Sequence, residues 1–406
     1  MEGATPAGNY RANWRDAAGK QKAKTFKTKK EARTYLAETE TTLSRGTYVD
    51  PHAGKVRVST FATLWQKARS GDELATQARV ASVLRTHVLP RWGETPVGKV
   101  DHLAVQQWVT DLAGRGLSAA SVADCHQVLS SILRTAIRDR LIGTNPCDDV
   151  KVPRRRKKDT DGRTITMGQL IDDLLPAVPD RFRAIVALAG GTGMRWGECV
   201  GLRWECVDLV NNTVSVVRVA VEIAGTVTTK PFPKSRAGRR TVPLPPFVAE
   251  LLAAHRDAFR AGAAGEVFTN TAGGPMRRTL FRARVWRPAI ARAGLLGRVD
   301  RLGHFKFRAA WQDAEGIEWG MEFTTERDAV AHIARVASNG LRFHDLRHSY
   351  ATWLVSQGVP VNDVREVMGH EQASTTLNLY THGSNGRTKR VLDAFADFSP
   401  TFEAAS

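Results

Sequence analysis

The sequence is short of cysteine, of acidic residues and of long apolar segments. Its four cysteines, among 406 residues, form no CxxC pair, so we expect neither a disulfide framework nor a zinc knuckle, and a reducing cytoplasm fits. No apolar run approaches the roughly 18 residues of a membrane-spanning helix, and the first residues contain no apolar signal-peptide core. We therefore expect a cytoplasmic protein that neither crosses a membrane nor is exported.

The shortage of acidic residues leaves a large positive charge. Lysine and arginine number 59 against 41 aspartates and glutamates, which gives a net charge of +18. A surplus of this size favours a polyanionic partner, and nucleic acid is the first candidate. At about 150 residues per domain, the length predicts two or three domains.

Residues 10–45 predict a β-hairpin followed by a helix. Apolar and polar side chains alternate from Tyr10 to Arg15, as in a strand with one face of each kind. Thr28 and Glu31 have the spacing of a capping box at a helix start. A DNA groove admits a basic β-ribbon, although a solvated hairpin without a DNA partner is also compatible with the pattern. The candidate DNA contacts are Arg11, Asn13, Arg15, Lys20, Lys22 and Lys24.

Residues 57–150 carry the periodicity of a helical bundle. Phe61, Leu64, Trp65 and Ala68 form one apolar stripe, and residues 128–137 contain another. Residues 151–163 then form a basic linker. Its arginines could follow a phosphate backbone, or the linker could be a solvated hinge; these candidates are Arg154, Arg155 and Arg156.

Four groups suited to phosphate chemistry lie near the C-terminus. His344 and Arg347, three residues apart on a predicted helix, share one face. Gly369 is expected to end the next helix and to expose His370. Tyr380 follows ten residues later. Arginine forks match phosphate oxygens, and histidines can donate hydrogen bonds or move protons.

A second box lies upstream, where Arg195 and Glu198 belong to the run TGMRWGE. This run, followed by HxxR, GH and a tyrosine in that order, resembles the tyrosine recombinase, or phage integrase, family. The resemblance implies an α+β catalytic domain in residues 164–300 and 341–406. It also implies an all-α, SAM-like core-site-binding domain in residues 57–150 and a small arm-type DNA-binding domain in residues 1–48.

The resemblance further implies the reaction. A site-specific recombinase of a phage or mobile element would cut and rejoin DNA through a 3′-phosphotyrosyl bond, without ATP, metal or another cofactor. Tyr380 would be the nucleophile and Lys234 the acid, with Glu198 in support; Lys230 competes with Lys234 for the acid role. The lysines lie at a predicted hairpin between two strand-like segments, Val214–Val221 and Arg240–Leu244. The groups around the phosphate would be Arg195, His344, Arg347 and His370.

The partners implied by the resemblance are double-stranded DNA with core-type and arm-type attachment sites, a homotetramer on DNA, and an accessory DNA-bending protein of the host or phage. Two alternatives share the fold: a nicking-closing enzyme of the topoisomerase IB type, and a DNA-binding relative without catalysis. A third alternative is a metallohydrolase, because His344, Asp345 and His348 loosely resemble the HExxH zinc motif.

Residues 301–340 form an insertion that repeats the N-terminal hairpin and helix. Phe307–Ile333 aligns without gaps to Tyr10–Leu36 at a constant offset of 297, and the matches fall on the apolar face, the turn and the helix start. The charge changes from +7 (nine basic, two acidic) to −4 (two basic, six acidic). We predict an interaction or regulatory module, with a tolerated surface insertion as the alternative. Three lysines are replaced by Ile317, Trp319 and Met321.

Overall fold

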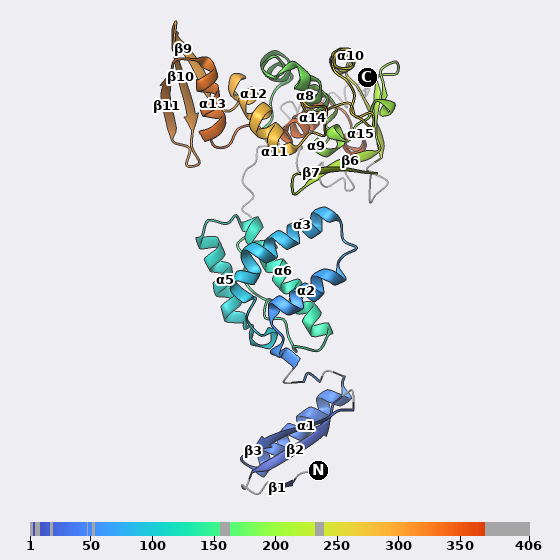
Figure 1. Ribbon diagram of the computed structural model, residues 1–406, viewed down its shortest axis with the longest axis vertical. Coiled ribbons are helices and arrows are strands. Elements are labelled where there is room, and N and C mark those ends of the chain that lie inside the picture. Colours follow the sequence, from blue (N-terminus) through green and yellow to red (C-terminus); the bar gives the residue numbers. More distant parts are fainter. Residues whose placement is uncertain are drawn as a thin grey trace, which may run out of the picture. The chain divides into compact units, whose positions relative to one another are not determined.

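The computed structural model describes residues 3–4, 9–16, 19–46, 48–50, 53–154, 163–231 and 239–369. The chain divides into two compact units, residues 1–158 and 159–406. Both combine helices with small sheets (Figure 1). No helix within the described ranges is both long and apolar enough to cross a membrane. Five predicted functional residues lie outside these ranges: Arg155, Arg156, Lys234, His370 and Tyr380.

The N-terminal module is a three-stranded antiparallel sheet with one helix. Its elements are β1 (Gly3–Ala4), β2 (Tyr10–Arg15), β3 (Gln21–Phe26) and α1 (Lys29–Ser44), in the sheet order β1-β2-β3. The short β1 adds a strand to the predicted hairpin. The capping box is confirmed, because the Glu31 N–H donates to Thr28 Oγ1 and the Thr28 N–H to Glu31 Oε2, both at 3.3 Å.

The predicted DNA contacts of this module fall on two faces of the sheet. Ala12 is buried on the face that α1 covers, and its cross-strand partner is Lys24, whose Nζ lies 4.5 Å from the centre of the Tyr35 ring. Lys22 shares this face and forms an ion pair with Asp50. By strand alternation, the opposite, open face carries the other contacts on β2, namely Arg11, Asn13 and Arg15.

The helical character predicted for residues 57–150 is confirmed. The long helix α6 (Ala119–Arg138) packs against the surrounding helices through a continuous apolar core. Two positions of the predicted stripe differ, because Leu64 and Ala68 are exposed, and Ala62 is buried beside Phe61 and Trp65. The other elements are α2 (Val58–Ala68), α3 (Leu74–Val83), η2 (Leu84–Val88), α4 (Leu89–Trp92), η3 (Val97–Lys99) and α5 (His102–Gly114).

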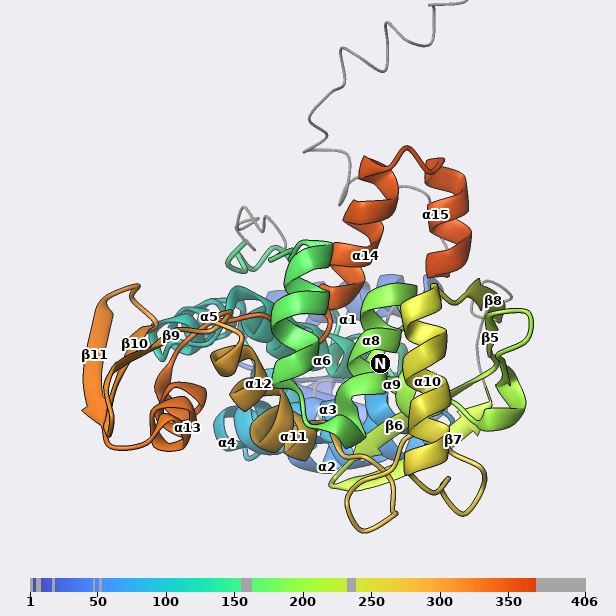
Figure 2. The same ribbon diagram turned by 90° about the horizontal axis from the view of Figure 1, so that it is seen from above.

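The second unit is organised around α8 (Asp180–Thr192), whose C-terminal half is buried. It packs against α10 (Pro246–Ala258) and α14 (Asp345–Ser356), which lie on either side of it (Figure 2). Outside the inserted module, the remaining helices are η4 (Gln169–Leu174), α7 (Leu175–Ala177), α9 (Trp196–Val200), η5 (Trp204–Cys206), α11 (Arg278–Phe281), η7 (Arg282–Trp286), α12 (Arg287–Arg292) and α15 (Val361–Met368). The strands are β4 (Val207–Asp208), β5 (Thr213–Val216), β6 (Arg218–Ile223), β7 (Thr226–Pro231) and β8 (Arg240–Pro243), in a sheet β4-β5-β8 and a hairpin β6-β7.

The inserted module has the fold and register of the N-terminal module. It contains β9 (Arg298–Gly303), β10 (Lys306–Gln312), β11 (Glu318–Phe323) and α13 (Glu326–Val336), in the sheet order β11-β10-β9. Arg308 pairs with Asp300, as Arg11 pairs with Gly3. The matching register extends to the third strand, which begins at Arg298, three residues before the predicted boundary.

The inserted module is packed onto the apolar core of the second unit. Val330 and Ile333 of α13 belong to the same buried apolar cluster as Ile290 of α12. The Arg287 guanidinium donates to the carbonyl oxygens of Ala334 and, at 2.5 Å, Ala337. The module is thus fixed to the helix that leads into it, and the chain then runs directly from the module to His344.

Candidate active site

Arg195 follows a sharp turn at the end of α8. Gly193 ends this helix with φ +64°, in the left-handed region that favours glycine. A Cβ atom there would lie 2.5 Å from Cδ1 of the buried Tyr350. Both the backbone conformation and the lack of space therefore require glycine. This requirement explains the glycine of the run TGMRWGE, because the turn at Gly193 places Arg195 immediately before α9.

Glu198 holds Arg195 in place from its buried side. Its carboxylate accepts the Arg195 backbone N–H and the Arg195 Nη1, each at 2.8 Å. The Glu198 side chain is fully buried, whereas 39% of the Arg195 side chain remains exposed. The buried carboxylate thus orients a guanidinium that is still open to an anion. The two predicted residues are brought together, and Glu198 occupies a supporting position.

Arg240, which sequence reasoning missed, completes this ion cluster. Its Nη2 lies 2.8 Å from Glu198 Oε2, and its side chain is only 6% exposed. Burial opposes ionisation of Glu198, but the hydrogen bond and charge of Arg240, with the charge of Arg195, outweigh it and lower the pKa of Glu198. The sequence did hold a signal for Arg240. It lies two residues before the buried Val242 on β8, and residues two apart on a strand point to the same face.

Arg347 joins the ends of two helices. It is buried in the first turn of α14, and two of its five N–H donors bind backbone carbonyls. Nη1 donates to the Gly193 carbonyl at 2.6 Å, and Nη2 donates to the Met368 carbonyl at 2.5 Å. Arg347 therefore holds the end of α15 beside the turn that precedes Arg195. Gly369 then ends α15 with φ +62°, as the sequence predicts.

His344 immediately precedes α14. The residue is exposed, and its ring packs edge-on against the ring of His348, with the centroids 5.2 Å apart. Partial desolvation of the ring, followed by the charges of His348 and Arg347, lowers the pKa of His344 to about 4. Arg195 contributes in the same direction. The imidazole is therefore neutral at neutral pH and can donate one hydrogen bond and accept another.

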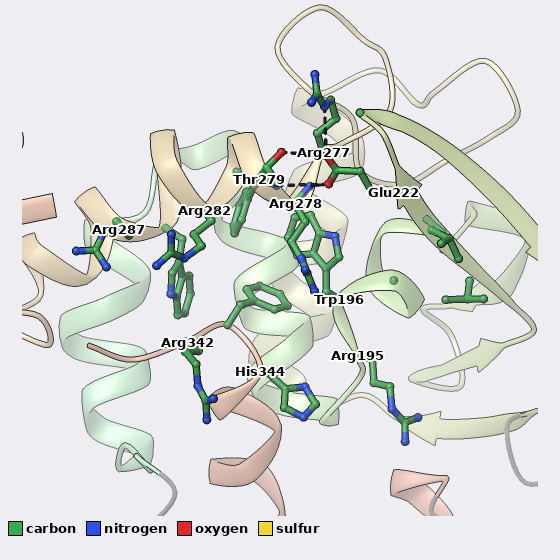
Figure 3. Close-up of a pocket in the computed structure, with 18 of the residues that line it drawn as sticks. Arg195, Trp196, Glu222, Arg277, Arg278, Thr279, Arg282, Arg287, Arg342 and His344 are labelled. Carbon is green, nitrogen blue, oxygen red and sulfur yellow. Dashed lines mark hydrogen bonds and ion pairs between the residues drawn. The ribbon is translucent and has the colours of Figure 1, made fainter. Parts of the chain in front are cut away.

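Arg195 and His344 lie at one end of a basic groove with a volume of about 870 Å³ (Figure 3). The groove continues along α11 and η7 to Arg287, and aromatic side chains form part of its wall. Glu222 is the single carboxylate among the residues that line it, so the groove favours an extended anion. The arginines that line it are Arg195, Arg277, Arg278, Arg282, Arg287 and Arg342.

Glu222 connects the β6-β7 hairpin to the wall of this groove. Its Oε2 accepts the Arg278 N–H at 2.7 Å, and its Oε1 accepts the Thr279 hydroxyl at 2.9 Å and Arg277 Nε at 3.3 Å. The carboxylate thus caps the start of α11 with a favourable charge. The hairpin includes Lys230 on β7, so this anchor joins the strand pair that carries Lys230 to the start of α11. Sequence reasoning missed Glu222.

Other nucleophiles and acids in this region have different roles. Burial raises the pKa of the Cys199 thiol well above its ordinary value, so Cys199 is a structural residue. The buried Asp345 carboxylate accepts the backbone N–H and the guanidinium of Arg342 at 2.7–3.2 Å. The acid of the HExxH-like alternative is therefore paired with Arg342 at the start of α14. Within the described ranges, no three His, Cys, Asp or Glu side chains are grouped to hold a metal ion.

Comparisons with known proteins agree with this geometry. The sequence model of the phage integrase family matches residues 167–312 and 323–387, slightly more than half of the chain. A tyrosine recombinase XerC-like protein of Caldanaerobacter subterraneus subsp. tengcongensis is 24% identical over 386 residues, which cover 91% of this chain and 90% of that protein.

Solved structures share the fold. The Tn1549 transposon integrase, in complex with transposon right end DNA, has a TM-score of 0.62 at 19% identity and covers 84% of this chain and 100% of its own. A lambda integrase tetramer bound to a Holliday junction has a TM-score of 0.51 at 15% identity, with 92% and 96% covered. The chain belongs to the phage integrase family of tyrosine recombinases, and it is a site-specific recombinase of a phage or mobile element that cuts and rejoins DNA.

Proposed function

We propose that Tyr380 is the nucleophile of this recombinase and that Arg195, His344 and Arg347 bind the scissile phosphate. The observation that supports this assignment best is the position of Arg347, which bonds to the carbonyls of Gly193 and Met368. One arginine thereby connects the turn before Arg195 with the helix end two residues before His370. The boxes that are far apart in the sequence converge on one basic site.

The reaction follows from the chemistry of these groups. The Tyr380 hydroxyl releases its proton to solvent water, and its oxygen forms a bond to phosphorus while the bond from phosphorus to the 5′-oxygen breaks. Lys234 gives that oxygen a proton, and the reverse attack by a 5′-hydroxyl restores the DNA. The arginines and histidines stabilise the charge that develops on the phosphate oxygens, a contribution of about 3–4 kcal/mol per well-placed donor. No ATP is needed because the phosphotyrosyl bond retains the energy of the phosphodiester.

Lys234 and Lys230 remain distinguishable by experiment. Lys230 is half-buried on β7 opposite Val219, a position within a regular strand, whereas Lys234 belongs to the segment between β7 and β8. We propose Lys234 as the acid. Replacing it with alanine should abolish cleavage of a normal 5′-oxygen leaving group yet preserve cleavage of a 5′-bridging phosphorothiolate, because a thiolate leaves without a proton. The same result for Lys230→Ala instead would exchange the two assignments.

The DNA contacts divide between the domains. We propose that residues 57–150 and the catalytic domain hold the core-type site and that the N-terminal module binds arm-type sites through Arg11, Asn13 and Arg15, which share the open face of its sheet. Arg154 is exposed and would contact phosphates with Arg155 and Arg156. Exchange between two duplexes needs four cleavages, which implies a homotetramer on DNA at the host nucleoid, with or without an accessory DNA-bending protein.

The direct test is to trap the enzyme on a nicked suicide duplex and identify the modified residue by mass spectrometry. We expect the adduct on Tyr380, and Tyr380→Phe should remove it while DNA binding is retained. Tyr350→Phe is the matched control, because Tyr350 is buried against Gly193 and burial raises its pKa. An adduct that persists in Tyr380→Phe contradicts the assignment. Relaxation of supercoils without exchange of partners would indicate a nicking-closing enzyme.

A further inference from the structure

The inserted module retains the fold of the N-terminal module but not its surface. In both modules the aromatic pair that joins sheet and helix has the same geometry. Trp14 and Tyr35 have ring centroids 5.3 Å apart, Trp311 and His332 have centroids 4.7 Å apart, and both pairs are inclined at 64°. The two modules therefore share one backbone fold, while their net charge differs, from +7 to −4. A net negative module has few cations with which to release counterions from DNA, so its surface fits a different partner.

The edge strand β11 is the exposed part of this surface. It is the outer strand of the order β11-β10-β9, and Glu318 to Glu322 are all exposed. Ile317, Trp319 and Met321 are 55%, 53% and 50% exposed, and they form an apolar strip along this edge. Trp319 is held in place by a hydrogen bond from its Nε1 to Asp313 Oδ2 at 2.7 Å. An open apolar edge strand is a template for pairing with another strand.

The charges on β11 select the partner. If two copies of β11 paired antiparallel about Gly320, Glu318 of each copy would face Glu322 of the other, and like charges placed opposite each other destabilise a sheet. A second β11 is therefore disfavoured. The suitable partner is an edge strand with cations and an apolar residue.

The N-terminal module provides such an edge. β3 is the outer strand of the order β1-β2-β3, and Lys20, Lys22 and Lys24, at the start of β3 and within it, alternate with Gln21 and Ala23 before Phe26. β3 pairs with β2 and β11 pairs with β10, so within the described part of the chain each strand has one edge without a partner strand. We propose that β11 of the inserted module binds β3 of the N-terminal module of a second copy, in competition with duplex DNA.

One antiparallel register satisfies both faces of the joined sheet. With Gly320 opposite Ala23, Ile317 lies opposite Phe26, and Trp319 lies opposite Lys24, whose ammonium group already contacts aromatic rings. On the open face, Glu318 lies opposite Thr25, whose partner on β2 is Arg11, and Glu322 lies opposite Gln21, whose partner on β2 is Arg15. Each carboxylate is then two strands, or about 10 Å, from the backbone of an arginine, a distance that the long side chains can span.

The consequence is mutual exclusion. Arg11 and Arg15 are proposed contacts of arm-type DNA, so a duplex and the inserted module use the same cations. This step rests on the proposed DNA contacts, whereas the strand pairing itself does not. In the DNA-free protein the acidic module would cover the arm-binding surface of a neighbouring copy, and a bound duplex would release it.

Disulfide cross-linking between two differently labelled copies tests the contact. One full-length chain carries Ala23→Cys and the other Gly320→Cys, both in a Cys206→Ser background, because the other three cysteines are buried. Position 320 accepts a side chain, since a Cβ there meets mainly the flexible end of Arg308, at 3.3 Å. We expect a cross-linked heterodimer in the mixture and not in either chain alone. Glu250→Cys on α10 replaces Gly320→Cys as the control and should give no cross-link.

Charge reversal and competition complete the test. E318K/E322K should reduce the cross-link yield at least fivefold, and E250K/D257K, with the same change in charge on α10, should not. A short duplex of arbitrary sequence should also lower the yield. Melting curves confirm that the variants fold. The proposal is overturned if no heterodimer forms, if E318K/E322K leaves the yield unchanged, or if DNA does not lower the yield. It is also overturned if the double variant A23C/G320C forms the cross-link only within single chains. Because the cross-link needs no cleavage, these outcomes leave the assignment of Tyr380 untouched.

Discussion

Arg240 and Glu198 form a buried ion pair at the base of the active site. Arg240 Nη2 lies 2.8 Å from Glu198 Oε2, with side-chain exposures of 6% and 0%. A buried charge without a partner destabilises a fold strongly, so Arg240 is the residue that allows Glu198 to stay ionised. Through Glu198 it also fixes the backbone and guanidinium of Arg195.

Arg240→Met should therefore destabilise the catalytic domain. The substitution leaves the Glu198 carboxylate buried with Arg195 as its remaining guanidinium partner, and we expect the free energy of unfolding to fall by about 3 kcal/mol. Urea denaturation of the full-length protein, followed by tryptophan fluorescence, measures the change. Arg256→Met is the control, because its ion pair with Asp257 is exposed and should be worth less than about 1 kcal/mol. Equal effects of the two substitutions would contradict a structural role for Arg240.

The same ion pair predicts the behaviour of the domain in acid. The pKa of Glu198 is lowered in the folded protein, so below the ordinary glutamate pKa of about 4.3 the unfolded chain binds a proton that the folded chain does not. The stabilisation from Glu198 is complete above that pH and is lost as the pH falls through the folded pKa. Glu198→Gln should flatten the dependence of the unfolding free energy on pH below about 4.5. An unchanged slope would show that Glu198 is not the group that titrates.

Much of the site could be predicted from local patterns. The end of α15 at Gly369 and the register of the repeated module follow from residue types at fixed spacings, and the structure shows both. The resemblance of the run TGMRWGE to the family implied that Glu198 supports Arg195, and the structure brings the two side chains together. These features depend on short stretches of chain, in which sequence distance determines spatial distance.

The missed features depend on contacts between distant segments. Arg240 reaches Glu198 across 42 residues, and Glu222 reaches Arg278 across 56. The strand pattern of β8 places Arg240 on the inward face, but residue spacing does not identify the partner of either residue. The strand-like segment Val214–Val221 was read as one strand, but it divides into β5 and β6, which pair with different partners. Lys22 and Lys24 were grouped with Arg11 by charge, whereas strand alternation places them on the opposite face.

His344 should remain neutral until well below neutral pH. Burial and the neighbouring cations lower its pKa to about 4, from an ordinary value of about 6.5. Between these two values the unfolded chain binds the extra proton, so His344 lowers stability as the pH falls from about 6.5 to 4. NMR titration of histidine-labelled protein, with His344→Asn to assign the resonance, should place the midpoint near pH 4. A midpoint near 6.5 would contradict the packing around the ring.

Glu222→Gln should slow strand cleavage while DNA binding changes little. The carboxylate binds the start of α11 through Arg277, Arg278 and Thr279, and hydrogen bonds to a charged group are worth about 1.5–3 kcal/mol. Glutamine keeps the shape but loses the charge, so the β6-β7 hairpin and the proposed lysine acid beyond it should become less well positioned. We expect cleavage on a suicide duplex to fall about tenfold, equivalent to about 1.4 kcal/mol.

Two comparisons separate this positioning role from a general loss of stability. Glu205→Gln removes an exposed carboxylate that pairs with Arg218 in the same domain, and it should leave the cleavage rate within twofold of the parent. In Glu222→Gln, a 5′-phosphorothiolate substrate should restore most of the rate, because its leaving group does not need the proton that a displaced lysine fails to deliver. If both substrates are slowed equally, the anchor acts on the groove as a whole and the lysine is not its target.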